Sequence, residues 1–260
     1  MIIFTWSVFI KNIKLFDAHF HIVDKRFPIV VNQGYLPEEF TYSDYLSRMQ
    51  GFTLCGGVVV SGSFQSFDQS YLVDALKKLG SEFVGITQLP ISVSDKELQV
   101  LGNCEIRGIR FNLKRGGSEG LHHLKDMATR VYDVVGWHVE LYVDSHELTG
   151  IYNTLLTLPA LSIDHLGLTK DGFGVLVKLA ERGVRVKASG FGRVNLNIRN
   201  ALKDLYAANP KSLMFGTDLP STRSPRAFDN NDIDLITDVF ESDQADNILY
   251  KNGLEFYSIN

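Results

Sequence analysis

The amino-acid sequence predicts a (β/α)8 barrel, and three observations lead to this prediction. Eight short runs of β-branched or apolar residues recur along the chain, and longer segments with helical periodicity lie between them. Such alternation of buried strands with helices is typical of βα units and a parallel sheet. The chain has 260 residues, and closed barrels of eight βα units commonly use about 250 residues as one domain.

The expected elements follow one another in chain order. The short apolar runs that we expect to form strands are Leu15–His21, Gly57–Ser61, Phe83–Leu89, Gly108–Leu113, Val139–Val143, Leu161–His165, Val184–Ser189 and Leu213–Asp218. The amphipathic segments that we expect to form helices are Asp68–Leu79, Glu119–Val135, His146–Leu156, Lys170–Glu181 and Asn195–Ala208, with one or two closing helices in Asp229–Tyr250. A doubly wound open sheet is the alternative. It requires a glycine-rich phosphate-binding turn after the first strand, where this chain has Asp17–His21.

Composition and charge exclude several classes of protein. With 45% hydrophobic and 22% charged residues, the chain is neither disordered nor collagen-like. Lys and Arg number 26 and Asp and Glu number 30, so the net charge is −4 and gives no electrostatic support for nucleic-acid binding. No run approaches the roughly 18 apolar residues of a membrane span, so no membrane partner is expected. The two cysteines, Cys55 and Cys104, point to a reducing compartment, and we expect a cytoplasmic protein.

We expect a single domain over residues 1–260, because no linker or change in composition divides the chain. Residues 1–14 form an N-terminal extension, in which Met1–Ile10 is apolar and aromatic. A secretory signal places positive charge before its apolar stretch, whereas Lys11 and Lys14 follow it here. The expectation is a packing strand or a plug beneath the core. A targeting segment and an unstructured extension are the alternatives.

Polar side chains at the ends of the expected strands form the candidate site, because chemistry in such barrels gathers where the strands end. The first run ends in His19 and His21, which share a face because strand side chains alternate. The sixth run ends at His165, and the eighth ends at Asp218, shortly before Pro220. The first and eighth strands are neighbours in a ring, so we expect these four side chains to converge. The alternative for Asp218 is the N-cap of a following helix.

Three segments resemble motifs of the amidohydrolase superfamily, namely Phe16–His21, Ile163–Gly167 and Phe215–Pro220. Further similar segments are Arg107–Asn112, Trp137–Tyr142 and Lys187–Gly190. Within the superfamily, the chain is similar to the amidohydrolase-2 branch, which includes 2-pyrone-4,6-dicarboxylate lactonase and related lactonases. The resemblance covers nearly the whole chain. It implies a barrel hydrolase that usually opens a lactone ring, with Asp218 as the general base.

The resemblance also bears on metal binding. Binuclear members of the superfamily use a carboxylated lysine and a further histidine on the fifth strand. Here the fourth run holds no lysine and the fifth exits through Tyr142–Asp144, so a two-metal centre is not expected. One divalent metal is an alternative, because three imidazoles and one carboxylate suit Zn²⁺. Its ligands would be His19, His21, His165 and Asp218. Without a metal, the three histidines would donate hydrogen bonds to the carbonyl oxygen, and the carboxylate would take a proton from the attacking water.

The residues expected to bind substrate are Arg110, Asn112, Arg193 and Arg223. Arg110 and Asn112 share a phase on the fourth strand, while the other two follow the seventh and eighth strands. Because the arginine fork matches the two oxygens of a carboxylate, we expect a small anionic substrate. The alternative for Arg110 is a buried ion pair with Glu140 on the fifth strand. Arg223 could instead be a solvated loop residue.

Together these residues predict a hydrolase that opens a carboxylate-bearing lactone with a water activated by Asp218. A metal-dependent decarboxylase and an amidase are the alternatives within the superfamily. A ligand-binding barrel without turnover is a third alternative. The branch commonly has Trp-Pro-His after the aspartate of strand eight, whereas this chain has Leu219–Ser221. The sequence predicts neither the exact substrate nor the oligomeric state.

Overall fold

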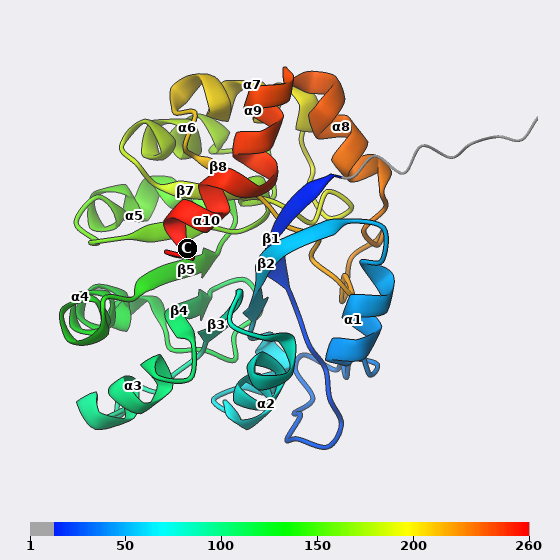
Figure 1. Cartoon of the computed structure of the whole chain (residues 1–260). Helices are drawn as coiled ribbons and strands as arrows, with labels where there is room; N and C mark the ends of the chain where they lie inside the picture. The colour runs from blue at the N-terminus through cyan, green and yellow to red at the C-terminus, as the bar shows by residue number, and fades with distance from the viewer. Residues whose placement is uncertain (1–12, 260) are drawn as a thin grey trace, which may run out of the picture.

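Eight parallel strands form one sheet in sequential order, from β1 to β8, in the computed structural model, which describes residues 13–259. Figure 1 shows these strands grouped into a ring with helices around its outside. The strands are β1 (Lys14–Phe20), β2 (Thr53–Val60), β3 (Phe83–Thr87), β4 (Ile106–Asn112), β5 (His138–Tyr142), β6 (Leu161–Ile163), β7 (Arg185–Ala188) and β8 (Leu213–Phe215). The predicted (β/α)8 barrel is confirmed. The expectation for Met1–Ile10 lies outside the described residues.

Helices follow the strands and cover the outside of the ring. The α-helices are α1 (Tyr42–Arg48), α2 (Ser70–Leu79), α3 (Asp95–Gly102), α4 (Leu124–Val135), α5 (Leu148–Leu155), α6 (Phe173–Glu181), α7 (Ile198–Ala208), α8 (Asn231–Val239), α9 (Ser242–Asp246) and α10 (Asn252–Phe256). The shorter turns are η1 (Ser63–Gln65), η2 (Leu121–His123), η3 (Ser145–Glu147), η4 (His165–Gly167) and the π-helical η5 (Asn247–Lys251). Within residues 13–259, no helix has both the length and the apolar character that a membrane crossing needs.

Side-chain caps fix where several helices begin. α1 starts with a capping box between Thr41 and Asp44, and α3 starts with one between Ser94 and Glu97. Neither helix was among the expected ones. The helix expected from residue 195 begins instead at residue 198, because the side chain of Asn197 accepts a hydrogen bond from a first-turn amide. Caps therefore define helix starts that the apolar pattern alone does not locate.

β1 and β8 form the seam at which the ring closes. The closing hydrogen bonds are made at and just beyond the ends of the two strands. The amide of Asp218 donates to the carbonyl oxygen of His19 at 2.7 Å, and the amide of His21 donates to that of Leu219 at 2.7 Å. Three of these four residues belong to the predicted site and the fourth, Leu219, lies in the loop after β8, so the contacts that close the barrel also fix the site.

The side chain of Asp17 lies on the outside of the barrel and also links β1 to the segment after β8. Its Oδ1 accepts from the amide of Thr217 at 2.9 Å, and its Oδ2 accepts from the Thr217 hydroxyl at 2.7 Å. The hydroxyl of Tyr45 in α1 donates to the same Oδ2 at 3.2 Å. Simple alternation would place Asp17 on the face of His19. The register of β1 against β2 shifts between Asp17 and Phe20, and such irregularities redirect side chains.

An apolar layer fills the barrel between the site and the end at which the strands begin. It consists of Phe16, Ala18, Val58, Val60, Val84, Ile86, Met214 and Tyr257. Tyr257 directly follows α10, which lies across the ring in Figure 1. Its ring centroid is 5.6 Å from that of Phe16. This packing closes one end of the barrel, and the predicted site residues lie toward the other end, where the strands finish.

Candidate active site

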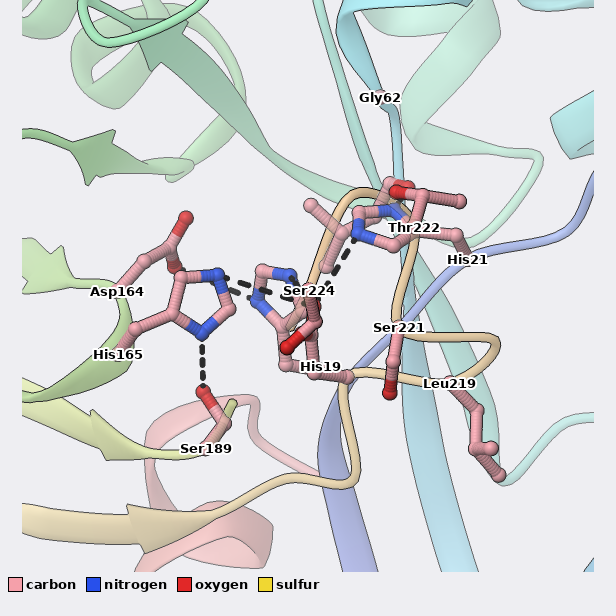
Figure 2. Close-up of polar contacts among 12 residues, drawn as sticks. His19, His21, Gly62, Asp164, His165, Ser189, Leu219, Ser221, Thr222 and Ser224 are labelled. Atoms are coloured by element: carbon pink, nitrogen blue, oxygen red, sulfur yellow. Dashed lines mark hydrogen bonds and ion pairs between the residues drawn. The ribbon is translucent and has the colours of Figure 1, made fainter. Parts of the chain in front are cut away.

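The four predicted catalytic side chains lie together at the carboxyl ends of the strands. His19 is in β1 and His21 just after it, His165 begins η4, and Asp218 lies in the loop after β8. The Nε2 atoms of the three histidines, in that order, lie 3.8, 3.7 and 3.8 Å from Oδ1 of Asp218. All four residues are buried, and Figure 2 shows the three imidazoles grouped in one place. One buried carboxylate oxygen therefore faces three ring nitrogens.

The backbone at the strand ends permits this convergence. His165 and Asp218 have φ angles of 51° and 60°, in the left-handed region that few residues other than glycine adopt. Gly216 allows β8 to approach β1, because a Cβ there would lie 2.8 Å from both the amide nitrogen and the Cβ of His19. Backbone strain of this kind clusters at functional sites.

Each imidazole is oriented by a contact at its Nδ1 atom. Nδ1 of His21 lies 2.7 Å from the carbonyl oxygen of Val60. Because a carbonyl only accepts, Nδ1 of His21 carries a proton and donates it in this contact. Nδ1 of His165 is 2.9 Å from the hydroxyl of Ser189 (Figure 2). Burial lowers the pKa of His165 to about 3 and holds the pKa of His19 well below its ordinary value, so both rings are neutral at pH 7.

Asp218 has one oxygen engaged and one oxygen free. Its Oδ2 accepts from Nε of Arg193 at 2.9 Å and also from Nη2, while its Oδ1 has no hydrogen-bond partner among the described residues. Burial alone would raise the pKa of this carboxyl, but the guanidinium of Arg193 holds it well below its usual range. The carboxylate is therefore ionised at neutral pH. Arg193, expected to stand free for substrate, is paired with this carboxylate.

Arg110 pairs with a different acid from the one expected. Its Nη2 and Nε lie 2.7 and 3.2 Å from Oδ2 of Asp164, and its Nη1 donates to the carbonyl oxygen of Ser61 at 2.8 Å. The alternative ion pair between Arg110 and Glu140 is wrong, although the two residues are neighbours in the register of β4 and β5. Arg110 extends to groups at the strand ends, whereas Glu140 is occupied deeper in the barrel.

Glu140 belongs to a buried polar network that the sequence analysis missed. Its Oε2 accepts from the ammonium of Lys187 in β7. Its Oε1 accepts from the hydroxyl of Tyr257 at 2.5 Å and lies 3.3 Å from Nε2 of His138. Burial would raise the pKa of Glu140, and Lys187 brings it below its ordinary value. Lys187 also lies 3.3 Å from Nδ1 of His19. A lysine inside an apolar strand was the signal that could have identified this network.

A cavity of about 30 Å³ lies at the site. It is lined by His21, Gly62, Ser63, Phe64, Arg110, Asn112, Arg115, Tyr142, His165, Arg193, Asp218, Thr222 and Arg223. The cavity has room for about one or two waters, which is less than a substrate ring needs. The loops after β1, β4 and β8 each contribute to its lining, among others through His21, Arg115 and Arg223. A larger hollow of about 730 Å³ beside α9 contains none of the predicted site residues.

Asn112 and Arg223 line this cavity and also hold its covering loops together. Oδ1 of Asn112 accepts from the amide of Arg115 at 2.9 Å, and the side chain of Asn32 donates to the carbonyl oxygen of Arg115 at 3.1 Å. Arg223 donates to the carbonyl oxygen of Asn32 and lies 4.5 Å from the ring centroid of Tyr35. The loops after β1, β4 and β8 are thus joined to one another over the site.

The donor set of His19, His21 and Asp218 fits a single divalent ion, and His165 lies outside this group. His19, His21 and Asp218 each place a ligand atom within 4.8 Å of the others, and His19, Asp164 and His165 form a second such group. Metal–ligand bonds of about 2.0–2.1 Å put the ligand atoms of a tetrahedral Zn²⁺ about 3.4 Å apart, close to the separations at Asp218. Within residues 13–259, Nε2 of His19 and Oδ1 of Asp218 have no hydrogen-bond partner, as ligand atoms require.

Comparisons with known proteins agree with this architecture. A 2-pyrone-4,6-dicarboxylate hydrolase from Comamonas testosteroni is 28% identical over 156 residues, which are 58% of this chain and 51% of that protein, so the match spans about half of its length. A 4-sulfomuconolactone hydrolase from Hydrogenophaga intermedia is 26% identical over 225 residues, 78% of this chain and 74% of that protein. The crystal structure of a probable 2-pyrone-4,6-dicarboxylic acid hydrolase from Acinetobacter baumannii shares the fold, with a TM-score of 0.83 and 21% identity over 95% of this chain and 100% of that chain.

The family itself is settled by a match over nearly the whole chain. The family model described as amidohydrolase matches residues 16–259. That range includes the three histidines, the aspartate after β8 and every strand except the first two residues of β1. The chain therefore belongs to the amidohydrolase family.

Proposed function

We propose that this protein is an enzyme that hydrolyses a small carboxylate-bearing lactone, with Asp218 as the general base. The observation that carries the proposal is the buried Oδ1 of Asp218. It has no hydrogen-bond partner in the described chain and faces three imidazole nitrogens at 3.7–3.8 Å. A carboxylate so placed can take a proton from a water that attacks a carbonyl carbon. The names of two relatives, a pyrone-dicarboxylate hydrolase and a sulfomuconolactone hydrolase, support this reaction class.

The first step is the attack of water on the ring carbonyl. Asp218 is ionised at neutral pH because Arg193 outweighs the effect of burial on its pKa. The cavity at Asp218 has room for the attacking water. As the water oxygen bonds to the carbonyl carbon, its proton passes to Oδ1 and the C=O electron pair moves onto the carbonyl oxygen.

The second step is the collapse of this tetrahedral species. Ring nitrogens of His19 and His165 lie beside the reacting carboxylate, where a proton on Nε2 would stabilise the developing oxyanion. In other enzymes, loss of one such donor costs about 100- to 1000-fold in turnover. The oxyanion pair re-forms the C=O bond as the ester C–O bond breaks, and the departing ring oxygen takes the proton that Asp218 gained. The carboxylate is thereby restored.

The arginines of the cavity favour an anionic substrate. Arg110, Arg193 and Arg223 all line it, together with Asn112. A guanidinium binds a carboxylate through two parallel N–H donors. In the free protein Arg193 donates to Asp218, so a substrate carboxylate would compete for donors that the base now uses.

A divalent metal is compatible with the same residues. The ligands would be His19, His21 and Asp218, with His165 beside them. Zn²⁺ bound there would supply Lewis-acid polarisation of the substrate carbonyl. The roles of the arginines in holding the substrate carboxylate are the same with or without it.

The first experiment identifies the reaction. Purified protein is analysed for metal content and screened against carboxylated lactones with a pH indicator, with and without a chelator. We expect acid release on at least one lactone. Release of CO₂ that depends on metal would instead indicate a decarboxylase, and turnover of amides alone would indicate an amidase. Ligand binding without any product would indicate a binding protein.

The second experiment tests the base. Asp218→Asn keeps the size of the side chain and one acceptor oxygen, and it should lower turnover by at least about 100-fold. Circular dichroism should show an unchanged fold. The matched control is Asp133→Asn, because Asp133 is an exposed aspartate outside the cavity. Wild-type turnover in a folded Asp218→Asn variant would refute the assignment.

A further inference from the structure

Lys187 lies inside the barrel beside a catalytic imidazole. Its Nζ is 3.3 Å from Nδ1 of His19 and 3.8 Å from Oδ1 of Asp164, and it donates to Oε2 of Glu140. All four residues are 0% exposed. No step of the proposed reaction uses this buried lysine. Its position behind His19 nevertheless determines what the other side of that ring can do.

The contact between Lys187 and His19 selects one tautomer of the imidazole. An amine flanked by two buried carboxylates is an ammonium, and an ammonium has three donors and no acceptor. Nδ1 of His19 must therefore accept in this contact. In a neutral imidazole one nitrogen accepts and the other carries the proton, so Nε2 of His19 carries the proton. His21 has the opposite arrangement, because its Nδ1 donates to a carbonyl oxygen 2.7 Å away.

A hydrogen bond to Asp164 would require the opposite tautomer, with the proton on Nδ1 of His19. Oδ1 of Asp164 lies 3.3 Å from Nδ1 of His19 but has no hydrogen-bond partner among residues 13–259. Its Oδ2 is held by Arg110. If Nδ1 of His19 carried the proton, Asp164 would accept it, and Nε2 would present a lone pair. That is the arrangement of histidines that bind metals, which commonly donate their other ring N–H to a carboxylate.

The residues around Glu140 hold the ammonium of Lys187 in its position beside His19. The carboxylate of Glu140 accepts from Lys187 on one oxygen and from the hydroxyl of Tyr257 on the other. Nε2 of His138 lies 3.3 Å from the second oxygen. Glu140 therefore cannot turn away from Lys187 without losing these contacts, and the lysine is held against His19.

We propose that Lys187 is a positioning residue that holds His19 with its proton on Nε2, so that His19 donates to the substrate oxygen and does not offer a lone pair to a metal ion. The role as donor rests on the proposed function, whereas the tautomer does not. Lys187 and Asp164 thus favour opposite tautomers of His19. The contact with Lys187 leaves Nε2 as a hydrogen-bond donor, whereas a hydrogen bond to Asp164 would leave Nε2 as a metal ligand. Without Lys187, the site should bind metal more tightly.

The test begins with the wild-type protein. Histidines are labelled with ¹⁵N, metal is removed with a chelator, and long-range ¹H–¹⁵N spectra at pH 7.5 report which ring nitrogen carries the proton. His19→Gln identifies the signals of His19. We expect His19 to be protonated on Nε2 and His21 on Nδ1, which makes His21 an internal reference. A His19 ring protonated on Nδ1 would overturn the proposal, and this measurement needs no substrate.

The second arm removes the lysine while preserving the balance of charge. In the double variant Lys187→Met with Glu140→Gln, we expect the proton of His19 to move to Nδ1 and the affinity for Zn²⁺ to rise by about tenfold or more. Tyr257→Phe is the matched control, because it changes the same network and leaves the Lys187 contact intact. An unchanged tautomer and an unchanged Zn²⁺ affinity in the folded double variant would overturn the proposal.

These readouts separate the proposal from the proposed function. If Asp218→Asn keeps its turnover while His19 carries its proton on Nε2, the reaction assignment fails and the role of Lys187 in setting the tautomer stands. If the double variant does not fold, the wild-type spectrum still decides.

Discussion

Replacing Asp17 with Asn should remove a pH dependence of stability that the wild-type protein carries between about pH 4 and pH 6. Asp17 is 0% exposed and accepts hydrogen bonds from Thr217 and Tyr45 at the β1–β8 seam. Burial raises the pKa of its carboxyl from 3.8 to about 6, although these hydrogen bonds act in the opposite direction. The raised pKa reflects the cost of a buried charge with no cationic partner at this site.

The sign of the effect follows from proton binding. The folded protein holds the proton of Asp17 more tightly than the unfolded chain does. The stability that this contributes is complete below about pH 4 and is lost as the pH rises through about 6. A shift of about two pKa units corresponds to about 3 kcal/mol. Asn does not titrate, so the variant lacks this loss, while all other ionisable groups act equally in both proteins.

The assay is urea-induced unfolding at pH values from 4 to 7.5. The measured quantity is the free energy of unfolding of the wild type minus that of Asp17→Asn, which should fall by about 3 kcal/mol across this range. A constant offset from the changed hydrogen bonds does not affect the slope. Asp133→Asn, at an exposed position, should show no such slope. If the profiles of the wild type and of Asp17→Asn run parallel, the carboxyl has no raised pKa and the reasoning about the seam is wrong.

Two further substitutions test the geometry of the site. Gly216→Ala should lower turnover by at least about tenfold and stability by about 1–3 kcal/mol, because the new Cβ would lie 2.8 Å from two atoms of His19. Steady-state kinetics and urea unfolding measure the two losses, and wild-type values would contradict the close approach. Arg193→Gln should move the acid limb of the kcat/KM profile to higher pH, since the pKa of Asp218 rises once the guanidinium is gone. An unchanged limb between pH 3 and 8 would mean that Arg193 does not control the base.

The barrel could be predicted from the sequence because its strands are buried on both faces. Such strands appear as nearly continuous apolar runs, and the run Phe83–Leu89 contains the whole of β3. α1 and α3 were not predicted, since with only seven and eight residues they show little helical period; the capping boxes at Thr41 and Ser94 were the signals that could have identified them. The outward direction of Asp17 could not be predicted either, because it depends on a local register shift in β1.

The site could be predicted as far as strand order determines it. His19 and Asp218 meet because the first and last strands are neighbours in a ring, and this follows from counting strands. The ion-pair partner of a long side chain depends on how far along the barrel axis its charged end reaches, and this distance cannot be read from the order of residues. Arg110 therefore pairs with Asp164 in place of its register neighbour, and the position of Lys187 behind His19 could be read only from coordinates.

The seam between β1 and β8 links the chemistry of this protein to its biosynthesis. Asp17 and Thr217 are 200 positions apart, so the ribosome releases His19 and His21 long before Asp218. Under the proposed mechanism, a nascent chain therefore lacks its general base until β8 packs against β1. Under the proposed mechanism, separation of β1 from β8 in the folded protein would also move Asp218 away from His19 and His21, and turnover would be lost.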